Sequence, residues 1–111
     1  MNFDQSPEFS KELKQLKKKY RSLDEDLRAF EKIVRQFPEG QGKHFNVLTR
    51  RNDIAIIKGR LFCKSLQDSS LRVVYAFHQN SITFLFIELF QKSEKDREDG
   101  KRVENYLKSL T

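Results

Sequence analysis

The first forty residues carry apolar side chains at helical spacing. In the first stretch they recur every three or four positions, at Phe9, Leu13, Leu16 and Tyr20. This spacing places them on one face of a helix. Ser6 followed by Pro7 is typical of a helix start, because serine caps free backbone amides and proline fits the first turn. We therefore expect a first amphipathic helix from about residue 7.

A second helix is predicted directly after the first. Its apolar stripe consists of Leu23, Leu27, Phe30, Val34 and Phe37, with Ile33 beside it. The run from Ser22 to Glu25 has the order of a capping box, in which the serine and glutamate side chains bond each other's backbone amides. Pro38 and Gly40 end this helix. Two short helices joined by a tight connection form a helical hairpin.

The pattern then changes to short runs of β-branched and aromatic residues, separated by turn residues. Such runs are typical of strands, and we predict three antiparallel strands over residues 54–64, 71–78 and 81–90. A short strand around Phe3 is also expected. A last helix over 94–109, capped by Ser93, has an apolar stripe formed by Val103, Tyr106, Leu107 and Leu110. The predicted fold is α+β: one domain, 1–111, with the helical hairpin packed on a small antiparallel sheet and a C-terminal helix.

The two faces of the first predicted strand differ in chemistry, because side chains alternate along a strand. One face is apolar and should meet the helices; it consists of Ala55, Ile57, Gly59, Leu61 and Cys63. The other mixes cations with apolar groups, at Ile56, Lys58, Arg60, Phe62 and Lys64. This second composition fits a surface that holds phosphates and stacks on bases. The alternative is an ordinary solvent face with extended cationic side chains.

Arg72 and Glu88 are the charged residues inside the next two strands. An arginine among Val and Tyr is costly unless it pairs or binds an anion. A two-residue turn at Gln79-Asn80 would offset the two strands, whereas a three-residue loop over 79–81 would place Arg72 opposite Glu88. The sequence leaves open whether the two residues form a salt bridge.

Composition adds a basic charge that is unevenly spread. The chain of 111 residues has a formal net charge of +6. Residues 41–92 hold eight Lys/Arg and three Asp/Glu, whereas the segments before and after are nearly balanced. A basic surplus favours polyanionic partners such as RNA, DNA or an acidic protein.

Other chemistry is not indicated by the residues. One cysteine, Cys63, and two histidines fall short of a zinc ligand set, and no cofactor motif is present, so we expect neither metal nor cofactor. His44 is expected to anchor a loop and His78 to lie at the surface. No apolar stretch approaches the length of a membrane span, and the first residues do not form a signal peptide. We expect a soluble, cytoplasmic protein without a membrane partner.

The order of elements, and several local runs, resemble the RelE/ParE toxin superfamily of bacterial type II toxin–antitoxin systems. The resemblance covers nearly the whole chain. The matching runs are Phe9 to Lys17, Lys58 to Leu61, Leu71 to Tyr75, and Ile82 to Glu88 with the residues that follow to Asp99.

The resemblance implies a toxin that a cognate antitoxin protein neutralises. RelE-like members cut mRNA on the ribosome by attack of a ribose 2′-hydroxyl on the adjacent phosphate. ParE-like members inhibit DNA gyrase without cutting RNA, and a third possibility is a non-toxic relative that binds only an antitoxin. For the RelE-like reading, the candidate catalytic residues are Arg72, Lys92 and Glu88, with Glu88 as base. The candidate RNA-binding residues are Lys58, Arg60, Lys64 and Phe62.

Overall fold

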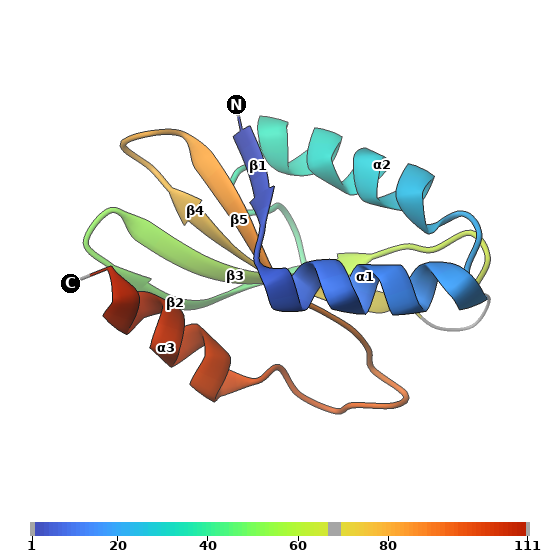
Figure 1. Ribbon diagram of the computed structural model, residues 1–111. Helices are drawn as coiled ribbons and strands as arrows, with labels where there is room; N and C mark the ends of the chain where they lie inside the picture. Colours follow the sequence, from blue (N-terminus) through green and yellow to red (C-terminus); the bar gives the residue numbers. More distant parts are fainter. Residues whose placement is uncertain (1, 67–69, 111) are drawn as a thin grey trace.

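The computed structural model describes residues 2–66 and 70–110 (Figure 1). A short strand is followed by two helices, four further strands and a final helix. In chain order the elements are β1 (Asn2–Gln5), α1 (Pro7–Lys19), α2 (Leu23–Gln36), β2 (Phe45–Arg51), β3 (Ile54–Leu61), β4 (Leu71–His78), β5 (Thr83–Gln91) and α3 (Gly100–Ser109). The predicted α+β class with a C-terminal helix is confirmed.

The strands form one mixed sheet in the order β1-β5-β4-β3-β2. Strands β2, β3, β4 and β5 pair antiparallel with one another, as predicted for β3, β4 and β5. β1 pairs with β5 in parallel. The pattern did not predict β2, because its side chains are mostly exposed and lack the regular apolar alternation of a half-buried strand.

Helices cover both faces of the sheet (Figure 1). On one face, α1 and α2 pack Phe9, Leu27 and Phe30 against the odd-numbered residues of β3 and β4. The predicted apolar face of residues 54–64 therefore does meet the helices. On the other face, α3 packs Val103 and Leu107 onto a second core formed by Ile56, Val74, Ala76, Ile87 and Phe90. Ile56 is thus fully buried, and its predicted place on an open surface is wrong, since α3 covers that end of the face.

The final helix begins later than predicted. Asp99 caps it, accepting hydrogen bonds from the amides of Lys101 (3.1 Å) and Arg102 (3.2 Å). Ser93 caps no helix: residues 92–94 form a turn, and residues 95–99 are irregular. The reason is that residues 94–99 have no apolar stripe that packing could hold against the sheet.

The predicted capping box at the start of α2 is also wrong. Ser22 has helical backbone angles and its side chain caps no amide of α2. Its hydroxyl instead donates to the buried Asp26 carboxylate (2.6 Å) and accepts from the Ser65 amide (3.0 Å). Ser22 therefore joins the connection between α1 and α2 to the segment that follows β3.

Candidate nucleic-acid interface

Strand pairing gathers a row of basic and aromatic side chains from separate segments. Arg60 of β3 lies opposite Arg72 of β4, and Arg72 lies opposite Phe90 of β5. On the other side of β3, the Arg60 amide donates to the carbonyl of His44 at 2.9 Å, so His44 continues the row just before β2. Residues directly opposite each other on adjacent strands share a face. His44, Arg60 and Arg72 are therefore neighbours on one face of the sheet.

Two adjoining clefts open over this row. The larger, of about 540 Å³, is lined by Arg60, Phe62, Ser70, Arg72, Lys92, Ser93 and Asp96. The smaller, of about 190 Å³, is lined by Lys43, His44, Asn46, Lys58, Gly59, Arg60, Arg72 and Lys92. Because Arg60, Arg72 and Lys92 line both, the two form one surface, which we call the basic cleft.

Arg72 is half-buried at the centre of the basic cleft. Its guanidinium donates to the Ser70 hydroxyl at 2.5 Å. In the part of the chain that the structure describes, no carboxylate forms an ion pair with Arg72 or Arg60. Burial, and then the charge of Arg60, lower the pKa of the Arg72 guanidinium. Arginine nevertheless stays protonated in proteins, so two positive charges face each other here. An anion bound between them would relieve the repulsion.

Phe62 supplies an exposed aromatic ring beside these cations. It is 60% exposed, which is unusual for phenylalanine. The Arg60 guanidinium lies 6.0 Å from its ring centre, and the His44 ring meets it edge-on at 5.3 Å. An exposed ring next to cations is the arrangement on which nucleic-acid bases stack.

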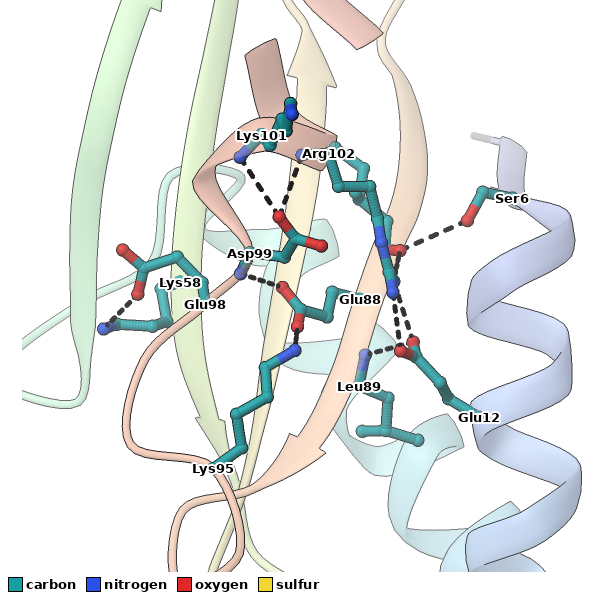
Figure 2. Close-up of polar contacts among 11 residues, drawn as sticks. Ser6, Glu12, Lys58, Glu88, Leu89, Lys95, Glu98, Asp99, Lys101 and Arg102 are labelled. Carbon is teal, nitrogen blue, oxygen red and sulfur yellow. Dashed lines mark hydrogen bonds and ion pairs between the residues drawn. The ribbon is translucent and has the colours of Figure 1, made fainter. Parts of the chain in front are cut away.

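Lys58 and Lys92, two of the candidate site residues, both line the basic cleft. Lys92 is exposed on the wall that follows β5. Lys58 is partly buried, and its ammonium pairs with a Glu98 oxygen at 2.7 Å (Figure 2). This hydrogen bond from Lys58 lowers the pKa of the Glu98 carboxyl. Lys58 is therefore neutralised in part, whereas Lys92 remains available to an anion.

Lys64, a predicted RNA-binding residue, does not line the basic cleft. Strand β3 ends at Leu61, so the alternation of faces does not extend to residue 64. The Lys64 ammonium pairs with Glu25 of α2 at 2.8 Å, and its amide donates to Asp26. Lys64 thus belongs to the contact with the helix layer.

Glu88 is fully buried and lines neither part of the basic cleft. Glu88 lies opposite Val74 rather than Arg72, so the two residues form no salt bridge. The two-residue turn and the three-residue loop considered for this hairpin are both wrong. Four residues, 79–82, separate the paired ends of β4 and β5, and a bulge at Ile87 shifts the register again. The Glu88 carboxylate instead accepts a hydrogen bond from the Asp99 amide at 2.8 Å and forms an ion pair with the Lys95 ammonium (Figure 2). A carboxylate held in this way serves to anchor the chain.

His44, Lys43 and Asn46 are cleft residues that the sequence did not predict. His44 was expected only to anchor a loop. Its position opposite Arg60 follows from the pairing of β2 with β3. The turn signal at Asn52-Asp53 before residues 54–64 could have indicated that hairpin, and with it the place of His44.

The chain matches no protein-family model, and comparisons with curated proteins and with solved structures give no match. Among the described residues, no helix is long and apolar enough to cross a membrane. Residues 2–66 and 70–110 also contain no cluster of His, Cys, Asp and Glu side chains that could hold a metal ion. The basic cleft is the main structural evidence for function.

Proposed function

We propose that the chain is a RelE-like toxin, a ribosome-dependent mRNA endonuclease of the cytoplasm that arrests translation and is neutralised by a cognate antitoxin. The observation that carries this proposal is the pair of facing arginines, Arg60 and Arg72, without a carboxylate partner among the described residues. Guanidinium groups bind phosphate through paired hydrogen bonds, so an RNA phosphate fits between them.

Two further features support an RNA ligand. Lys58, Arg60, Arg72 and Lys92, four basic candidate residues of the RelE-like reading, all line one cleft. Phe62 offers an exposed ring next to Arg60, on which a base next to the bound phosphate can stack.

The reaction requires a bound phosphate to become more negative as it is attacked. The ribose 2′-oxygen bonds to phosphorus while the bond to the 5′-oxygen breaks, which leaves a cyclic phosphate and a free 5′-hydroxyl. Arg60 and Arg72 would hold the oxygens on which the charge develops. Lys92, at the exposed edge of the cleft, would donate a proton to the departing 5′-oxygen. The buried Glu88 has no part in this scheme.

Induction of the chain in a bacterial host without its antitoxin tests the proposal. We expect growth arrest in which protein synthesis stops first and cellular mRNA is cleaved within coding regions. DNA-damage signalling with intact mRNA would contradict the proposal and favour a ParE-like gyrase inhibitor. Normal growth at a confirmed level of folded protein would also contradict it, and favour a relative that binds only an antitoxin.

A further inference from the structure

The smaller part of the basic cleft contains one side chain able to take up a proton at neutral pH. Its ionisable lining residues are Lys43, His44, Lys58, Arg60, Arg72 and Lys92. Lysine and arginine are already protonated at neutral pH, whereas imidazole is the group that ordinarily exchanges protons there. Among these described residues, His44 is therefore the natural proton acceptor.

The position of His44 suits contact with a nucleotide whose phosphate lies between the arginines. It is the next member of the row formed by Arg60 and Arg72, joined to Arg60 through the backbone hydrogen bond of 2.9 Å. Directly opposite residues on adjacent strands have Cβ atoms about 5 Å apart, so the imidazole stands next to the arginine row. The ribose beside the bound phosphate would therefore lie over the imidazole.

The His44 ring is also free to react. The ring is half-buried and meets Phe62 edge-on at 5.3 Å between ring centres. Within residues 2–66 and 70–110, no side chain or backbone group forms a hydrogen bond with the ring nitrogens. The ring nitrogens are therefore open to a substrate hydroxyl.

Asp96 is the other candidate acceptor, because it lines the larger part of the cleft. It lies in the segment 92–99 that follows β5, outside the row that contains the arginines. A carboxylate would repel a phosphate, whereas an imidazole carries no negative charge. Geometry and charge both favour His44.

We propose that His44 is the catalytic base of the basic cleft, a role that rests on the proposed RNA cleavage. Its imidazole takes the proton of the ribose 2′-hydroxyl as the 2′-oxygen bonds to phosphorus. The phosphorus–5′-oxygen bond breaks, and the 5′-oxygen receives a proton from the Lys92 ammonium. Water then removes the proton from His44 and returns one to Lys92, so the protein ends unchanged.

The test measures single-turnover cleavage of ribosome-bound mRNA by the purified full chain, with His44→Ala and His78→Ala compared. His78 is a matched control, because it bonds the Tyr106 hydroxyl at the end of β4 and lines neither part of the cleft. We expect His44→Ala to cleave about 10²–10⁴-fold more slowly, with RNA affinity within about threefold of the original chain. His78→Ala should retain its rate.

A rescue experiment separates catalysis from structure. Free imidazole should restore part of the rate to His44→Ala, because it can replace the missing base, and it should leave the rate of the original chain unchanged.

Equal cleavage by His44→Ala and the original chain would overturn the role of His44 and leave the proposed nuclease intact. The role of His44 would also be overturned if His44→Ala cleaves more slowly, imidazole does not restore its rate, and the fold-loss of rate equals the fold-loss of RNA affinity. If the original chain cleaves no mRNA, the proposed function itself fails. His44→Gln, which keeps a polar side chain of similar size, should reproduce the loss if His44→Ala does not fold.

Discussion

Arg60 and Arg72 face each other on neighbouring strands, and among the described residues neither has a carboxylate partner. Other cations, such as Arg50 and Arg102, do pair with a carboxylate. Like charges in facing positions destabilise a sheet, and burial lowers the pKa of Arg72 further from its ordinary value. Residues that weaken a fold without compensation are typical of functional sites. At the scale of single residues, this pair is the clearest sign of an anion ligand.

Arg72→Ala should weaken binding of single-stranded RNA by about tenfold or more, because charge-assisted hydrogen bonds contribute about 1.5–3 kcal/mol each. The thermal midpoint should stay equal or rise, since the substitution removes a repulsion. Fluorescence anisotropy with labelled RNA at fixed salt measures the affinity, and thermal denaturation measures the fold.

Arg50→Ala is the matched control for this prediction. It removes the same charge from an exposed position on β2, where Arg50 pairs with Glu39 at 2.8 Å, outside the basic cleft. We expect its RNA affinity to change by about twofold at most, because exposed pairs contribute little. Equal losses of affinity in the two variants would mean that RNA responds only to net charge.

At the scale of elements, buried polar contacts attach the C-terminal part of the chain to the sheet (Figure 2). Glu88 of β5 forms an ion pair with Lys95 and accepts a hydrogen bond from the Asp99 amide. Arg102 of α3 donates to the carbonyl of the bulged Ile87 and to both oxygens of Glu12 on α1. These contacts fix residues 92–99, which form one wall of the basic cleft.

Glu88→Ala should lower the free energy of unfolding by about 2–3 kcal/mol, because it leaves the Asp99 amide and the Lys95 ammonium without their acceptor. Urea denaturation measures this change. Hydrogen exchange should show the fastest new exchange in residues 92–103. Glu104→Ala is the control, because Glu104 pairs with Lys108 on the exposed side of α3; its cost should stay below about 0.5 kcal/mol. A similar cost for both variants would contradict the anchoring role of Glu88.

The elements with buried stripes could be predicted from the sequence, and the exposed or irregular ones could not. α1 and α2 follow from apolar spacing, and β3, β4 and β5 from dense β-branched and aromatic runs. β2 has no buried alternation, so nothing in its own pattern marks it. The start of α3 depends on the Asp99 cap rather than on apolar spacing.

Residues of the candidate site divide in the same way, into those that local sequence predicts and those that depend on strand pairing. Arg60 could be predicted from alternation within β3, and Arg72 because it is a charge inside an apolar strand; both signals need only local sequence. Phe62 lines the cleft although β3 ends one residue before it. The role of Glu88 depends on a bulge and a four-residue connection, which set the register between two strands. The place of His44 depends on the pairing of β2 with β3, a contact between segments that local sequence does not reveal.

At the scale of the whole molecule, uneven coverage of the sheet creates the basic cleft. α1 and α2 cover one face, while α3 covers only the part of the other face around Ile56, Val74 and Ala76. The remaining part carries Arg60, Arg72 and Lys92, from the segment that holds most of the surplus charge. One face thus combines a stable core with an open cationic surface.

The most direct test of the account adds the purified chain to translating ribosomes and maps the mRNA ends by primer extension. The account predicts new mRNA ends within the coding region and arrest of translation by the original chain. Arg72→Ala, folded to the same extent, should produce neither effect, whereas Arg50→Ala should produce both. Intact mRNA in the presence of the original chain, or cleavage by Arg72→Ala at the original rate, would contradict the claim that the basic cleft cuts RNA.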